Sequence, residues 1–153
     1  MYKTIVVGTD GSPRAQLAVD AAQSLAALTG ATLHVVCAYQ SSLVLASIAG
    51  AAGGPMPIDL TDGREQARGI AEGAAAIPRQ AGITVETHMV DRGAADALCD
   101  VAWALRADLI VVGNRGMSGA GRVLGSVPNT VTHHASCAVL VVPTDRITHL
   151  RNG

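Results

Sequence analysis

The sequence contains no phenylalanine, and aromatic residues make up only 2% of its 153 positions. Charged residues are also scarce at 15%, whereas hydrophobic residues reach 49%. A chain of this length and hydrophobicity can bury a core without disulfides or a structural metal, which excludes an intrinsically disordered protein. Because large rings are almost missing, we expect one domain whose core consists of Val, Ile, Leu and Ala.

The sequence has no strong excess of charge of either sign, since its formal net charge is −1. A near-neutral chain has no field that would attract DNA, RNA or an acidic membrane surface. Residues 21–58 contain no Asp, Glu, Lys or Arg, but polar residues, Gly and Pro interrupt this stretch. We therefore expect neither a nucleic-acid partner nor a membrane span.

Cysteine is rare as well: the chain has three, at positions 37, 99 and 137, and none forms a Cys-x-x-Cys pair. An odd number without paired spacing argues against a disulfide framework or a zinc site. The N-terminal apolar run is too short for a signal peptide. We expect reduced, buried cysteines in a cytoplasmic protein.

Apolar runs alternate with helical patterns along the whole chain. Strands are predicted over residues 4–8, 33–38, 83–89, 109–113 and 139–142, and helices over 12–30, 62–78, 98–105 and 127–135. This alternation predicts an α/β fold: an open, doubly wound, Rossmann-like parallel sheet of five strands in the order 3-2-1-4-5, with helices on both faces. We assign residues 1–146 to this domain and 147–153 to a C-terminal tail.

The second predicted helix contains a proline and has one apolar face. Ala67, Ile70, Ala74 and Ile77 recur at helical spacing, and Pro78 follows them. Because proline lacks a backbone N–H, we expect the helix to weaken at Pro78 and to end by Gly82. The preceding residues 40–60 show no lasting period and are expected to form a long connection.

The turn after the fourth strand is rich in glycine, with five glycines in the thirteen positions from Gly113 to Gly125. Glycine allows successive N–H groups to turn inward around an anion, and the helix predicted near Ser126 would add its unpaired N–H groups. Arg115 and Arg122 could add charge-assisted hydrogen bonds. Phosphate is the ligand that this pattern favours, and the alternative is a solvated surface loop.

The turn after the first strand carries Asp10 within Gly-Thr-Asp-Gly-Ser, residues 8–12. Ligands of doubly wound sheets bind beyond the carboxyl ends of the strands, where strand order reverses. If the first and fourth strands are neighbours, Asp10 faces the glycine-rich turn and could accept from ribose or adenine. The alternative is that Asp10 closes an Asx turn or caps the first helix.

These two turns together resemble those of universal stress proteins. The resemblance rests on residues 8–12 and on Gly113-x-x-Gly116 leading to Gly125-Ser126, and it covers essentially the whole chain. It implies an adenine-nucleotide-binding stress-response or signalling module, with ATP as ligand and Mg²⁺ as a companion of ATP. The site residues that it implies are Thr9, Asp10, Ala38, Gly113, Arg115, Gly116, Gly125, Ser126 and Val127.

One spacing departs from the family's ATP-binding pattern. Eight residues separate Gly116 from Gly125, one fewer than in that pattern. A shorter segment changes where its N–H groups point, so AMP and cyclic AMP remain open as ligands beside ATP. An adenine nucleotide is the firmer prediction.

The sequence contains no motif that would make a catalytic centre. Gly125-Ser126 lacks the adjacent lysine of a P-loop, and residues 116–120 lack the final glycine of a hydrolase elbow. We expect function by occupancy with at most slow ATP hydrolysis. The alternatives are a nucleotidyl- or phosphoryl-transfer enzyme and a nucleotide-free interaction protein. The resemblance also implies a homodimer, which would form through the last strand, residues 139–142.

The histidines do not form a metal-binding motif in the sequence. His133 and His134 are adjacent, so on a helix they point in different directions. His34, His88 and His149 are isolated and are expected to be packing or surface residues. No metal site is predicted.

Overall fold

Five parallel strands form one sheet in the computed structural model, which describes residues 1–41, 62–114 and 124–144. The strand order is β3-β2-β1-β4-β5, which confirms the predicted topology. The elements, in chain order, are β1 (Thr4–Gly8), α1 (Pro13–Thr29), β2 (Thr32–Tyr39), α3 (Asp62–Gln80), β3 (Val85–Asp91), α4 (Ala94–Leu105), β4 (Leu109–Gly113), α5 (Ser126–His134) and β5 (Ala138–Val142).

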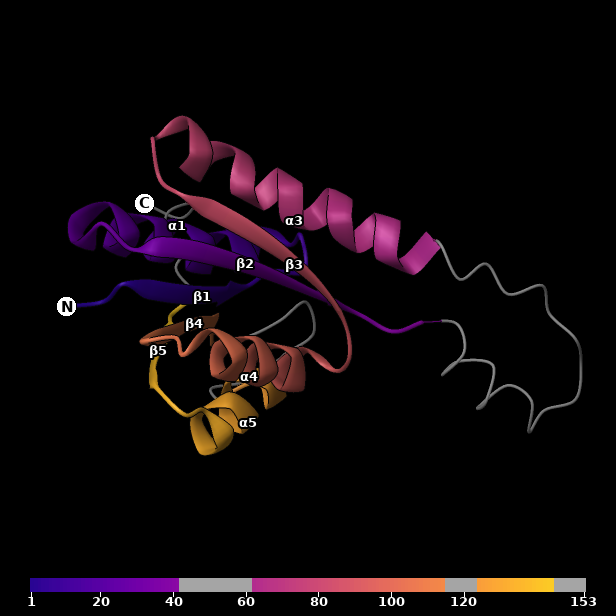
Figure 1. Ribbon diagram of the computed structural model, residues 1–153. Coiled ribbons are helices and arrows are strands. Elements are labelled where there is room, and N and C mark those ends of the chain that lie inside the picture. Colours follow the sequence, from indigo (N-terminus) through magenta and orange to yellow (C-terminus); the bar gives the residue numbers. More distant parts are fainter. Residues whose placement is uncertain (42–61, 115–123, 145–153) are drawn as a thin grey trace, which may run out of the picture.

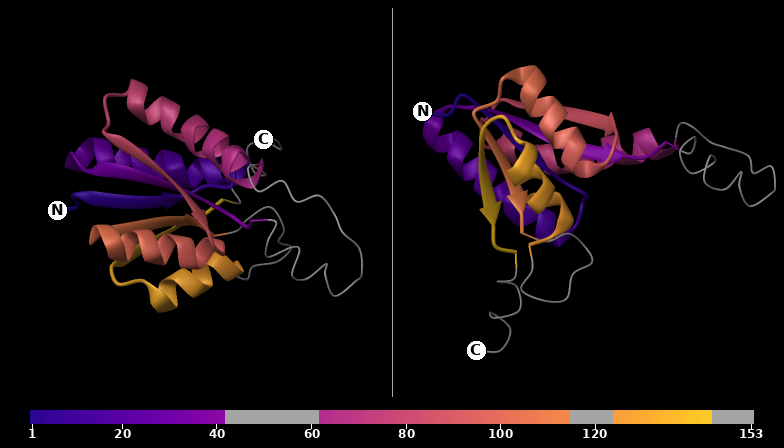
Figure 2. Two further views of the ribbon diagram at one scale, coloured as in Figure 1. Left: turned by 45° about the vertical axis from the view of Figure 1, so that its right-hand side comes forward. Right: turned by 90° about the horizontal axis from the view of Figure 1, so that it is seen from below.

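Helices cover both faces of the sheet: α1 and α3 lie on one side, and α4 and α5 on the other (Figures 1 and 2). Successive residues of β1 enter different cores, with Ile5 and Val7 on the α1 and α3 side and Val6 on the α4 side. This period of two is that of a strand buried on both faces. The β-branched run therefore joins the two hydrophobic layers.

Small side chains bring α1 close to the sheet. Its buried residues are Ala18, Val19, Ala22 and Ala26. The helix begins as predicted, because the Ser12 side chain accepts a hydrogen bond from the N–H of Ala15 at 3.1 Å. No helix among the described residues is long and apolar enough to cross a membrane.

The second helix ends between Pro78 and Gly82, as predicted, but the predicted apolar face was wrong at Ile77. Helix α3 continues through Pro78 to Gln80, and Ile77 is 57% exposed, so it does not belong to the buried face. The buried face consists of Ala67, Ala71, Ala74, Ala75 and Pro78, which recur at spacings of three and four residues. Packing of the proline ring in the core offsets the hydrogen bond that proline cannot donate.

Asp108 joins the starts of β1 and β4. Its Oδ2 accepts hydrogen bonds from the backbone N–H groups of Lys3 at 2.7 Å and Thr4 at 2.9 Å. These hydrogen bonds stabilise the charged form and hold the pKa of the Asp108 carboxyl below its ordinary range. The N-terminal strand is thereby fastened beside β4, which carries one side of the candidate site.

We expect Asp108→Ala to lower the midpoint of urea unfolding at neutral pH. Because the pKa is lower in the folded state, the carboxylate stabilises the fold above its unfolded pKa, and this contribution is lost as the pH falls through the folded pKa. The difference between variant and wild type should therefore shrink in acid. A difference that stays constant down to pH ~2, below the ordinary Asp pKa of about 3.9, would contradict this role.

Candidate functional site

A cavity of about 310 Å³ lies beyond the carboxyl ends of β1, β2 and β4. Its size is that of a small-molecule site. Chain order reverses at this point, because β1 has β2 on one side and β4 on the other. The crevice therefore occupies the position where doubly wound sheets bind their ligands.

The described residues of the predicted site all line this crevice: Thr9, Asp10, Ala38, Gly113, Gly125, Ser126 and Val127. The structure thus brings the two predicted turns and the end of β2 to one place. Arg115, Gly116 and Arg122 lie outside the described residues. That the crevice residues contact a ligand stays a prediction.

Backbone and side-chain hydrogen bonds fix the turn after β1. The N–H of Thr9 donates to the Val36 carbonyl at 2.9 Å, and Asp10 Oδ1 accepts from the Ser12 N–H at 2.9 Å. Asp10 therefore closes an Asx turn, which was one of the two roles that the sequence left open for it. The side chain is exposed at the crevice, so one carboxylate oxygen can shape the turn while the other meets a ligand.

Helix α5 directs its N-terminus into the crevice. Gly125 is its N-cap and has no side chain to accept from the first turn, and that turn carries no acidic residue. The N–H groups of Ser126 and Val127 and the positive end of the helix dipole therefore favour an anion here. Pro128, also at the crevice, contributes no N–H.

Hydrogen bonds of Asn114 join the end of β4 to the start of α5 and to the residues after β5. The Gly125 N–H donates to the Asn114 carbonyl at 2.9 Å, and the Asn114 N–H donates to the Val142 carbonyl at 2.9 Å. Asn114 Oδ1 accepts from the N–H of Thr144 at 2.8 Å and from its Oγ1 at 2.6 Å. These contacts hold the N-terminus of α5 beside the end of β4, although residues 115–123 between them are outside the described part.

Apolar residues that could not be placed at this site from the sequence complete the crevice. They include Val36 on β2, Leu98 on α4 and Val112 on β4. A Cβ added to Gly8 would lie 3.1 Å from Leu98 Cδ1, so glycine lets α4 approach the first turn closely. The crevice thus combines an apolar surface with an anion-attracting helix end, which suits a flat ring bearing a phosphate.

Cys37 lies between Val36 and Ala38, which line the crevice, but its surroundings disfavour the reactive thiolate form. It is buried on β2, and burial raises the pKa of its thiol, with a smaller contribution from the Asp10 charge. The thiolate is the reactive form, so this environment disfavours reaction. Cys99 and Cys137 are half-buried, and all three cysteines are free.

The chain is similar to universal stress proteins in sequence. The profile of the universal stress protein family matches residues 1–143. Universal stress protein Rv1636 of Mycobacterium tuberculosis is 38% identical over 153 residues, covering 94% of this chain and 97% of that protein.

Two solved structures of nucleotide complexes are similar to this fold. A universal stress protein in complex with cAMP is 36% identical with a TM-score of 0.70, and the match covers 94% of this chain and 98% of that one. The universal stress protein from Archaeoglobus fulgidus in complex with dAMP is 26% identical with a TM-score of 0.68, covering 92% and 97%. Both match nearly the full length.

Proposed function

This chain belongs to the universal stress protein family, and from that premise we propose that its crevice binds an adenine nucleotide as part of a stress-response module. The adenine ring packs against the apolar surface formed by Val36, Ala38 and Leu98. The phosphate lies at the N-terminus of α5. The observation that carries the proposal is the meeting of these two chemically different surfaces in one cavity.

Relatives support the ligand class. A member 36% identical to this chain forms a complex with cAMP, and another, 26% identical, forms one with dAMP. Both ligands carry adenine and a single phosphate group, which is the combination that the crevice favours. Within this class we propose ATP as a further ligand, with Mg²⁺ accompanying its phosphates.

The proposed mode of action is occupancy, with at most slow hydrolysis of ATP. Asp10 is the one ionisable side chain among the described residues that line the crevice, and one of its oxygens closes the Asx turn. General acid–base catalysis needs a group positioned at the reacting atoms. The described residues supply anion binding and an apolar surface, which are binding functions.

Calorimetric titration of the purified chain with ATP, AMP and cyclic AMP tests the proposal. We expect saturable binding of at least one of them at one site per chain. Inosine monophosphate, which keeps the phosphate and changes the purine edge, serves as the ligand control and should bind more weakly. If none of the three adenine nucleotides gave a heat of binding at millimolar concentration, the proposal would be rejected.

We also propose a homodimer formed through β5. This strand is an edge of the sheet, because β4 is its one neighbour in the described sheet, and Leu140 on it is 37% exposed. An edge strand offers unpaired backbone groups to a second copy. Light scattering at micromolar concentration should give twice the chain mass; a monomer mass would reject the dimer.

A further inference from the structure

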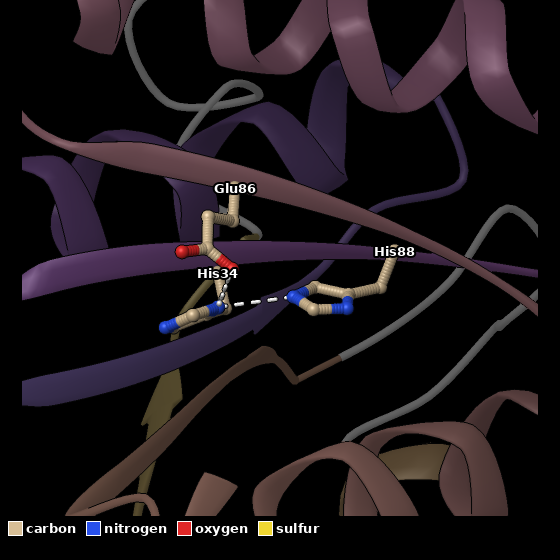
Figure 3. A group of neighbouring side chains, drawn as sticks. All are labelled: His34, Glu86 and His88. Carbon is tan, nitrogen blue, oxygen red and sulfur yellow. Dashed lines mark hydrogen bonds and ion pairs between the residues drawn. The ribbon is translucent and has the colours of Figure 1, made fainter.

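Three side chains from two strands, His34 on β2 and Glu86 and His88 on β3, meet on one face of the sheet (Figure 3). His34 on β2 is the register partner of Glu86 on β3, and His88 follows two positions later on β3. Alternate residues of a strand share a face, so these side chains lie on the same face as Val36, which packs in the α4 core. Both histidines are isolated in the sequence, and their contact depends on strand order and register.

One nitrogen atom lies at the centre of this group. His34 Nδ1 lies 3.0 Å from His88 Nε2 and 3.6 Å from Glu86 Oε2. The His34 side chain is 6% exposed, whereas that of Glu86 is 59% exposed, so the carboxylate can adjust its position at little cost. The group is open to solvent on the Glu86 side and anchored in the protein on the His34 side.

Both imidazoles favour the neutral state. Burial lowers the pKa of His34, and the neighbouring His88 lowers it further; burial also lowers the pKa of His88, and the Glu86 charge opposes these effects only in part. A hydrogen bond joins His34 Nδ1 and His88 Nε2, and the Glu86 carboxylate faces the same His34 nitrogen. A cation in place of the bridging proton would accept electron pairs from all three atoms.

We propose that His34, Glu86 and His88 bind a divalent transition metal of the zinc class. Two imidazoles and one carboxylate are donors that zinc accepts, whereas Mg²⁺ and Ca²⁺ prefer oxygen atoms alone. Ligand atoms bound to a tetrahedral zinc ion lie about 3.3 Å apart. The contacts of 3.0 and 3.6 Å bracket this spacing, and all three ligand atoms lie within 4.8 Å of one another.

The metal would fasten the edge strand β3 to β2, because His34 comes from one strand and the other two ligands from the next. None of the three ligands lines the nucleotide crevice. The metal site is therefore additional to the proposed nucleotide site, and either one can fail without the other. Three protein ligands also leave a fourth position for water.

Titration of the full chain with Co²⁺ and Zn²⁺ tests this site. Co²⁺ reports tetrahedral coordination through its visible absorption, and Zn²⁺ should displace it at one equivalent per chain. We expect His88→Ala to weaken binding by roughly 100-fold or more and Glu86→Gln by roughly 10-fold or more. His134→Ala is the matched control, since His134 is an exposed histidine at the end of α5, and it should bind as wild type does.

A thermal measurement keeps the test independent of absorption. Zn²⁺ at about 100 times its dissociation constant should raise the unfolding midpoint of the wild type by roughly 5 to 10 °C and that of His88→Ala by at most about 2 °C. Glu86→Gln changes an exposed side chain, so it provides a folded variant if His88→Ala unfolds. Equal binding by wild type and Glu86→Gln, a thiolate charge-transfer band, or no stoichiometric binding would each overturn the proposal.

Discussion

Ser126→Asp is expected to lower the affinity for ATP, AMP or cyclic AMP by roughly 100-fold or more without destabilising the protein. Ser126 is exposed at the first position of α5, where the crevice meets the helix N-terminus. A carboxylate at that position takes the place of the phosphate and repels it. The same carboxylate interacts favourably with the helix dipole, so stability should stay level or rise by about 0.3–1 kcal/mol.

Two controls distinguish phosphate exclusion from damage to the crevice. Ser126→Asn has nearly the same shape without the charge, and its affinity should stay close to that of wild type. Adenosine carries the ring without a phosphate, so Ser126→Asp should bind it as wild type does. If Ser126→Asp bound AMP normally, the phosphate would not lie at α5; if it lost adenosine as well, repulsion would not be the cause.

Strands β1 and β4 could be predicted to the residue because each is a continuous apolar run with a buried centre. The predicted bounds of the first and fourth strands, 4–8 and 109–113, are those observed. Helix α3 was harder, since the effect of Pro78 depends on whether its ring finds a place in the core. Local propensity argues for a break at proline, and tertiary packing overrode it here.

The polar part of the candidate site was also predictable, because carboxyl ends of parallel strands meet at one edge and glycine marks where the backbone approaches a ligand. The apolar part was not predictable. Leu98 faces the crevice because of how α4 packs on Gly8, and its spacing along the helix is equally typical of a residue in the hydrophobic core. The pairing of His34 with His88 likewise follows from strand register, which a single sequence does not specify.

Asn114 has a structural role that the sequence does not indicate, because it stands at a position of the glycine-rich motif where any residue is allowed. Its side-chain oxygen accepts hydrogen bonds from Thr144. We expect Asn114→Leu to lower the free energy of unfolding by roughly 2–4 kcal/mol. Thr144 is only 1% exposed, and the variant leaves its N–H and hydroxyl without the amide oxygen that accepts from both. A buried donor that loses its acceptor costs more than the hydrogen bond itself contributes.

A double-mutant cycle with Thr144→Val, measured by urea unfolding, separates this contact from general damage. Thr144→Val alone should cost about 1 kcal/mol, and in the Asn114→Leu background it should cost less or even stabilise, because the hydroxyl left without its acceptor is removed. If the losses of unfolding free energy in the two single variants simply added up in the double variant, the contact between Asn114 and Thr144 would contribute nothing. The Gly125 N–H donates to the backbone carbonyl of Asn114, which Asn114→Leu retains. The variant removes the side-chain anchor that holds this backbone in place, so it should weaken nucleotide binding too, whereas Thr144→Val should leave binding close to normal.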